Sequence, residues 1–247
     1  MTRRAAGALV ALIVLAGITL HLHAQSGSGS TRVTQTSYLK ASNPDADDHF
    51  GCGGVLQGHT GQGVAVSADG TTLAVGAPHE SGGSPGINGN QRDNSDFDAG
   101  AVYVFIRKGE HWTQQAYVKP SNPRSSAEFG HAVALSADGN TMVVSAFWES
   151  SHAKGINGNQ KDESATEAGA AYLFTRTGTT WQQQAYIKGS NTEAYDEFGS
   201  SIAMDRSGQT LVISARGEDG GGRGEGGKQA DNSVDEAGAV YVFRVDR

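Results

Sequence analysis

Cysteine is almost absent from this chain of 247 residues, and Cys52, the single example, cannot form a disulfide within the chain. The histidines form no H-x-x-H or H-E-x-x-H pair, so no zinc motif is present. Basic residues are outnumbered, with 19 Lys and Arg against 26 Asp and Glu, which gives a formal net charge of −7. A nucleic acid is therefore not an expected partner, because proteins that bind one present a basic surface. Cys52 lies in a Gly-rich stretch and is interpreted as a small loop residue, with an intermolecular disulfide as the alternative.

Long apolar runs are also scarce, and the one in this sequence lies near its start. Arg3 and Arg4 precede an almost unbroken apolar run from Ala5 to Leu20, and the small residue Ala24 precedes a polar stretch. This order of charged, apolar and small residues is typical of a signal peptide, and the run is short for a membrane span of about 20 residues. The sequence therefore predicts a signal peptide over 1–24, a linker over 25–32, and a secreted, periplasmic or cell-surface protein with no membrane contact after cleavage. An uncleaved membrane anchor is the alternative.

The usual enzyme motifs are missing as well. The sequence has no G-x-S-x-G elbow and no G-x-x-x-x-G-K-[ST] phosphate loop, and no serine, histidine and acid stand out together. We therefore expect a non-enzymatic protein with no catalytic residue and no cofactor.

What the sequence does contain is a strong internal repeat, which governs the expected fold. The segment from Ala99 to Phe105 (AGAVYVF) returns 69 residues later as AGAAYLF and, after another 69, as AGAVYVF. A Phe-Gly pair recurs too, but its first interval is ten residues longer, which indicates an insertion between Phe50 and Ser67. The periodic aromatic residues are interpreted as packing residues rather than as a ligand platform. The residues that define the repeat are Phe50, Gly51, Phe129, Gly130, Phe198, Gly199, Tyr103, Tyr172, Tyr241, Trp112 and Trp181.

Each copy contains four strand-like runs separated by turn residues. Short Gly turns join the first run to the second and the third to the fourth, whereas a long segment joins the second to the third. No window has a sustained helical period, so helix is not expected. Four short antiparallel strands per repeat predict an all-β, propeller-type array of three blades. In the second copy the four runs are His131–Leu135, Thr141–Ala146, Ala170–Thr175 and Trp181–Ile187.

The repeat region is expected to cover 33–247, in copies of about 41–119, 120–188 and 189–247. Its first run, 33–40, matches the fourth strands of the first two copies, so we expect this N-terminal strand to complete the last blade as its fourth strand.

The motif order within each copy is that of a known repeat family. In the second copy, Phe129-Gly130 is followed by Asp138-Gly139 and then by the segment Gly169 to Phe174, and the first copy adds Gly-Ala-Pro at 76–78. The chain resembles the FG-GAP repeat proteins, which are integrin α-like, and in particular their bacterial type. Copies two and three depart from the pattern, with Ala-Phe147 and Ala-Arg216 in place of Ala-Pro. The resemblance implies a β-propeller used for extracellular binding or adhesion.

The calcium loop of that family does not carry over to this chain. It needs several carboxylates at alternate positions between the first two strands, whereas the equivalent turns here hold one each, namely Asp69, Asp138 and Asp205. We therefore expect that calcium is not required. The long loops are richer in acids, which raises the hypothesis of a divalent-cation site, with a solvated acidic rim as the alternative. The candidate ligands in these loops are Asp93, Asp96, Asp98, Asp162, Asp231 and Asp235.

The resemblance and the long loops together predict an exported binding or adhesion module. Its partner is an extracellular protein or glycan that contacts the long loops on one face. A structural fragment of a larger propeller and a hydrolase with a site on the propeller axis are the alternatives. Three blades form a tighter ring than the usual four to eight. We therefore expect self-association, as a six-blade homodimer with terminal strands exchanged, with a fragment that folds as an arc as the rival.

Overall fold

The structure is a computed structural model that describes residues 31–53 and 61–246. The chain divides into two units, Met1–Thr36 and Ser37–Arg247, and the fold concerns the second. The predicted signal peptide lies outside the described residues. Within them every regular element is a strand, which confirms the all-β prediction, and no helix has the length and apolar character to cross a membrane.

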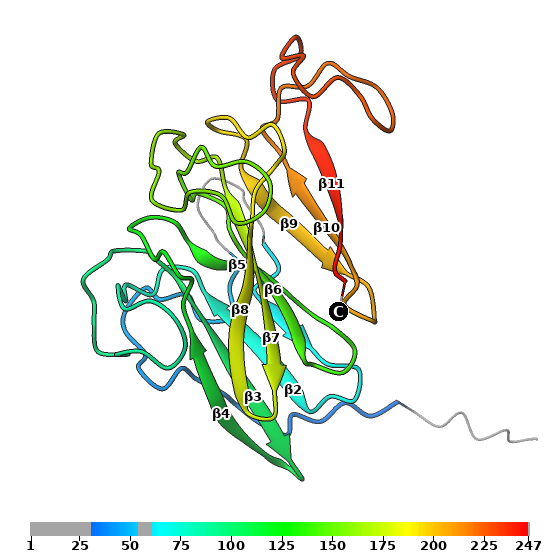
Figure 1. The fold of residues 1–247 in the computed structure, drawn as a ribbon. Helices are drawn as coiled ribbons and strands as arrows, with labels where there is room; N and C mark the ends of the chain where they lie inside the picture. Colours follow the sequence, from blue (N-terminus) through cyan, green and yellow to red (C-terminus); the bar gives the residue numbers. More distant parts are fainter. Residues whose placement is uncertain (1–30, 54–60, 247) are drawn as a thin grey trace, which may run out of the picture. The chain divides into compact units, whose positions relative to one another are not determined.

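The described residues form three antiparallel sheets in which consecutive strands are neighbours (Figure 1). The prediction of a propeller-type array of blades is confirmed. The first sheet contains β1 (Val64–Val66), β2 (Thr72–Ala77), β3 (Ala101–Lys108) and β4 (His111–Val118). The second contains β5 (Phe129–Leu135), β6 (Thr141–Ala146), β7 (Ala170–Thr177) and β8 (Thr180–Ile187). The third contains β9 (Phe198–Met204), β10 (Thr210–Ala215) and β11 (Ala239–Arg244).

The sequence repeat is also a repeat of strand register. Ala77 pairs with Ala101 in the first sheet, and the residues at the equivalent positions pair in the other two sheets. The β3–β4 and β7–β8 ladders each contain an irregularity at the same place, between Val104 and Phe105 and between Leu173 and Phe174. The first strand differs most between copies, since β1 has three residues and β5 has seven. Residues 54–60, within the predicted insertion, lie outside the described residues.

The Phe-Gly pairs lie where one blade meets the next. Phe129 packs edge-on against Tyr172 of its own blade, with ring centroids 5.4 Å apart, and shares one buried cluster with Val102 and Val104 of the first blade. Gly130 has a φ of 99°, and a Cβ there would lie 2.5 Å from the carbonyl oxygen of Ala101. Only glycine therefore allows the two backbones to approach so closely.

The remaining periodic aromatics pack as the sequence predicts. Tyr103 and Tyr172 are fully buried, and so is Trp181, over which the guanidinium of Arg176 lies 5.2 Å from the ring centroid. Trp112 is half-buried in the first blade.

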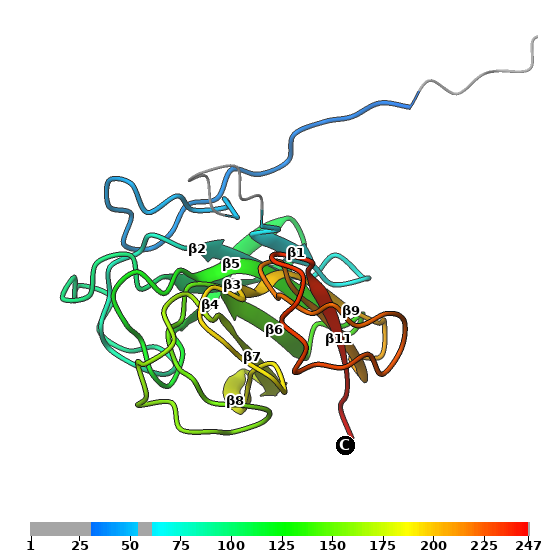
Figure 2. The same cartoon turned by 90° about the horizontal axis from the view of Figure 1, so that it is seen from above.

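The third sheet corrects one prediction. It has three strands among the described residues, with β11 at its edge, and the run 33–40 forms no strand. Ala41, directly after that run, belongs to the buried cluster of the first sheet. The second sheet lies between the first and the third, with β2 against β5 and β5 against β9 (Figure 2). Leu39 and Ala41 are therefore held at the opposite end of the array from β11.

Candidate functional site

The long loops lie together at one end of the sheets. They connect the second strand to the third at 78–100, 147–169 and 216–238. In an antiparallel meander these connections emerge at the same end as the links between blades, and the short hairpins lie at the other end (Figure 1). We call this set of loops and links the long-loop face.

A buried ion pair anchors the base of each of the first two long loops. The Lys119 ammonium lies 2.9 Å from the carboxylate of Glu80, and the Lys188 ammonium lies 3.0 Å from that of Glu149. All four side chains are buried. Burial lowers the pKa of both lysines, and the neighbouring glutamate opposes that effect. Each pair ties the start of a long loop to the end of the fourth strand of its blade.

A second contact, repeated in all three blades, joins each long loop to the link that precedes its blade. In the first blade, the Tyr103 hydroxyl donates to the amide oxygen of Asn43 at 2.7 Å, and the amide nitrogen of Asn43 donates to the carbonyl oxygen of Gln91 at 2.8 Å. Asn122 and Asn191 make the same two contacts in the other blades. Burial raises the pKa of the three tyrosines, which keeps their hydroxyls protonated as donors. Hydrogen bonds thus connect each long loop to the link that precedes its blade.

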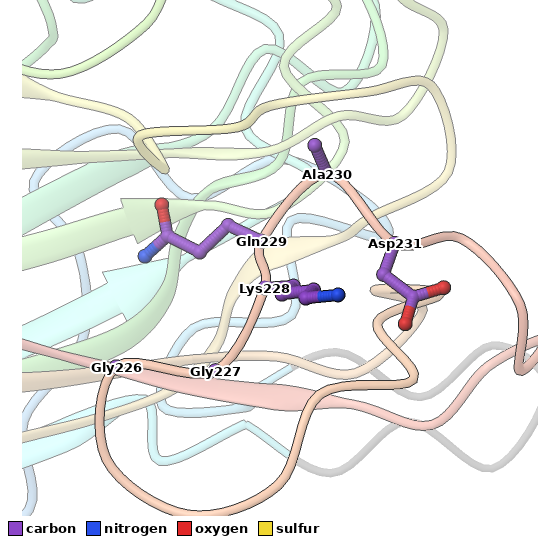
Figure 3. Close-up of a pocket in the computed structure, with 6 residues that line it drawn as sticks. All are labelled: Gly226, Gly227, Lys228, Gln229, Ala230 and Asp231. Atoms are coloured by element: carbon purple, nitrogen blue, oxygen red, sulfur yellow. The ribbon is translucent and has the colours of Figure 1, made fainter.

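The third long loop has a further hydrogen bond to the link that precedes its blade. Its Gln229 accepts a hydrogen bond from the Ser190 hydroxyl at 2.8 Å. Figure 3 shows the Gln229 side chain pointing to the opposite side of the loop from Lys228 and Asp231. A shallow hollow here is lined by one continuous segment, 226–231, rather than by converging elements.

Two of the acidic candidates accept hydrogen bonds from residues of their own loops. Asp93 accepts hydrogen bonds from the Ser84 hydroxyl and the Ser95 amide, and Asp162 accepts one from the Ser164 amide. These contacts lower the pKa of both carboxyls.

The other four candidates do not join them in one site. Asp96 and Asp231 are half-buried, Asp235 is exposed, and Asp98 lies beside His79. Across 31–53 and 61–246, no group of three or more His, Cys, Asp or Glu side chains is arranged to hold a metal ion.

Two exposed aromatic residues on this face were not among the residues predicted from the sequence. Phe97 and Tyr195 are 68% and 60% exposed. The Ser126 amide donates to the carbonyl oxygen of Phe97 at 2.7 Å, and the Tyr195 amide donates to that of Thr166 at 2.8 Å. Phe97 corresponds to Thr166 in the repeat, and Ser126 corresponds to Tyr195. Each of the two blade junctions therefore presents one aromatic side chain, from opposite sides of the junction. The signal in the sequence was an aromatic residue in a loop where the copies differ.

A cluster of histidines and acids at the junction of the first two blades was not predicted from the sequence either. His79 lies between Asp98, at 3.8 Å, and Glu128, at 3.5 Å, and Glu128 lies 4.0 Å from His131. Burial, and then the nearby Asp98 charge, raises the pKa of Glu128 to about 7. Burial lowers the pKa of His79. His79, Glu128 and His131 are all buried.

Antiparallel sheets of consecutive strands, stacked with β2 against β5 and β5 against β9, define a β-propeller-type repeat protein. The FG-GAP repeat matches residues 112–174 and 181–243, each span running from the fourth strand of one blade to the third strand of the next. The chain belongs to the FG-GAP repeat family.

Among solved structures, the chain is similar to a protein from Bacteroides uniformis provisionally designated a 6-phosphogluconolactonase. The identity is 12% and the TM-score 0.35, over 74% of this chain and 40% of that protein, so the chain spans less than half of its length. No curated protein sequence matches the chain.

Proposed function

We propose that this protein is an exported, non-enzymatic binding module that recognises an extracellular protein or glycan through its long-loop face. The proposal is based on the long-loop face, where hydrogen bonds connect the loops to the links and where Phe97 and Tyr195 are exposed. Loops held in one conformation lose little entropy on binding, which favours affinity. Exposed aromatic side chains on a fixed surface are frequent anchors of recognition.

Variation between the copies supports the same proposal. The contacts that hold the loops recur in every blade, whereas the exposed aromatics occur at one position per junction. A repeated scaffold with loop residues that vary between copies is an arrangement by which repeat proteins acquire a specific ligand.

The binding test uses a printed glycan array and a panel of immobilised matrix proteins. We expect the purified protein to bind at least one of them. The double variant Phe97→Ala/Tyr195→Ala should bind at least about 10-fold more weakly, since each truncated anchor costs more than about 1 kcal/mol. His111→Ala is the control, because His111 is exposed in the hairpin at the other end of the blade. Unchanged binding by the double variant contradicts the proposal, and so does hydrolysis of the bound partner.

Export is tested separately. Expressed in a bacterium with its own N-terminus, the protein should be recovered outside the cytoplasm and begin at Gln25, as read by N-terminal sequencing. An intact Met1 on cytoplasmic protein contradicts the export part of the proposal without affecting the binding part.

A further inference from the structure

The outer edge of the third sheet has an unfilled side. In the first two sheets the third strand lies between two neighbours, whereas β11 has β10 on one side only within the described residues. Val240 and Val242 of β11 are also 64% and 69% exposed, because no blade covers this face of the third sheet among the described residues, while their equivalents Val102 and Val104 are buried against the second blade. A cavity of about 680 Å³ lies beside β11, lined among others by Val240, Tyr241 and Glu218.

Glu218 is the third member of the series formed by Glu80 and Glu149. It is buried like them, and it accepts hydrogen bonds from the Asn191 side chain at 2.8 Å and from the Gly220 amide at 2.9 Å. The other two glutamates also hold a lysine from the end of a fourth strand. No cation lies within ion-pair distance of Glu218 among residues 31–53 and 61–246. The third blade thus has the acceptor for a lysine at the end of a fourth strand.

The chain itself carries a segment of the required sequence. Ser37-Tyr38-Leu39-Lys40 matches the ends of the fourth strands at 116–119 (AYVK) and 185–188 (AYIK). Asn43 follows Lys40 at the spacing with which Asn122 follows Lys119. Tyr38 is 80% exposed, and Lys40 is exposed as well. In the first blade, the residues at these positions are Tyr117 and Lys119, and both donate to Glu80.

We propose that residues 33–40 of a second copy of this chain add to β11 as the fourth strand of the third blade. Lys40 of the second copy then pairs with Glu218, and Tyr38 of the second copy donates to the same carboxylate. A second copy is required because Ala41 fixes the segment to the first sheet, with the second sheet between it and the third. The added strand covers an otherwise open edge through main-chain hydrogen bonds. Two copies that exchange strands in both directions form six blades, within the usual range of four to eight.

The register of the added strand follows from the other two blades. Val102 pairs with Val118, and Tyr103 pairs with Tyr117. Leu39 of the second copy should therefore lie opposite Val240, and Tyr38 opposite Tyr241. The side chains of Val240, which is exposed, and of Leu39, which is half-buried against the first sheet of its own copy, then lie on the same face of the added strand pair.

A disulfide trap tests this register in the full-length chain, with Cys52→Ser as the background. Leu39→Cys combined with Val240→Cys should give a covalent dimer on a non-reducing gel after mild oxidation. Tyr38→Cys with Val240→Cys is the matched control, because the two sulfurs then point to opposite faces. Larger ladders of linked chains also support strand donation to a second copy. A cross-link within one chain, or no cross-link, overturns the proposal.

A charge test uses the untrapped protein. Light scattering should show a dimer, and Lys40→Glu should raise its dissociation constant by about 100-fold, because the variant places a like charge against a buried carboxylate. Lys40 is exposed, so the substitution leaves the fold of the single copy intact. Lys108→Glu makes the same charge change at an exposed hairpin and should leave the dimer unchanged. A clean monomer, or a dimer insensitive to Lys40→Glu, overturns the proposal.

Discussion

At the scale of single residues, the polar groups inside the blades are as periodic as the apolar ones. Glu80, Glu149 and Glu218 lie at equivalent positions, and each is buried at the start of a long loop. A buried ion pair adds little net stability over an apolar pair, but it penalises any arrangement in which one partner is left alone. We infer that the two ion pairs, Glu80–Lys119 and Glu149–Lys188, hold the first two long loops in register with the fourth strands of their blades.

The second blade allows this to be measured. Lys188→Met leaves the Glu149 carboxylate buried without its partner, and we expect the free energy of unfolding in urea to fall by about 3–5 kcal/mol. The double variant Glu149→Gln/Lys188→Met should recover most of this loss. Lys154→Met, in the exposed part of the same loop, is the control and should change stability by less than about 0.5 kcal/mol. An equal loss in the single and double variants would argue against a charge effect.

The acid cluster at the first junction predicts a pH dependence. The pKa of Glu128 is raised to about 7 in the folded protein, from 4.5 for an unperturbed glutamate. Between these values the unfolded state loses a proton that the folded state keeps, so the free energy of unfolding falls as the pH rises from about 4.5 to about 7. Glu128→Gln removes this loss, and the variant should be more stable than the wild type at pH 8, by at most about 3 kcal/mol.

The test is urea unfolding at pH 5 and pH 8. His79, His131 and Asp98 face Glu128 and remain in the variant. Glu197→Gln is the control, since the equivalent Glu197 pairs with Arg216 at 2.6 Å instead, and it should leave the dependence on pH in place. A Glu128→Gln variant that is less stable at pH 8 would show that a protonated histidine holds the carboxylate.

At the scale of elements, the junction between blades depends on glycines that allow two backbones to meet. Gly76, on β2, lies against Gly130 at the start of β5, and a Cβ on Gly76 would lie 2.0 Å from the carbonyl oxygen of Gly130. The same closeness holds at Gly100, where a Cβ would lie 2.0 Å from the carbonyl oxygen of Phe129. Stacking of the blades therefore involves close backbone contact in addition to apolar burial.

Gly130→Ala tests this contact, with Gly178→Ala as the control. Both residues have positive φ, so both variants incur backbone strain of about 1–2 kcal/mol. Gly178 has nothing within 4 Å of its added Cβ, whereas Gly130 meets the Ala101 oxygen at 2.5 Å. Gly130→Ala should therefore cost about 1–3 kcal/mol more than Gly178→Ala in urea unfolding. Equal losses would show that only the φ angle matters.

At the scale of the whole molecule, the turns between the first and second strands bear on calcium. Asp69 accepts hydrogen bonds from Ser67 and from the amide of Thr71, and these contacts lower its pKa to about 2. Asp205 has the equivalent role in the third blade, where Ser207 and the Thr210 amide lower its pKa to about 2. Each of these carboxylates therefore accepts hydrogen bonds from its own turn, and each turn holds one carboxylate.

We therefore predict that calcium contributes little to the stability of the whole molecule. Thermal unfolding with and without EDTA should give melting temperatures within about 2 °C, since 1 kcal/mol corresponds to about 2–4 °C for a chain of this size. A melting temperature that falls by more than about 10 °C in EDTA would show instead that the protein holds a stabilising cation. Urea unfolding in added calcium is the complementary measurement, and it should leave the transition midpoint unchanged.

The sequence by itself determined the blades. Strand runs, short Gly turns and the Phe-Gly pairs depend on neighbours close along the chain, and each of them occurs in all three copies of the repeat. For this reason Thr141–Ala146 was predicted with the bounds that the structure gives to β6, and the packing role of Tyr103 and Trp181 followed from their periodicity.

The tertiary structure alone decided which blades meet and which residues face each other there. The run 33–40 has the sequence of a fourth strand, but the placement of Ala41 on the first sheet keeps it from β11. Glu128 and His79 are far apart in the sequence and meet only because the second blade stacks on the first. Phe97 and Tyr195 are not periodic, so the repeat predicts no packing role for them, and only the fold shows that both are exposed at blade junctions. Contacts within a blade are local and repeat, whereas contacts between blades depend on the arrangement of the whole array.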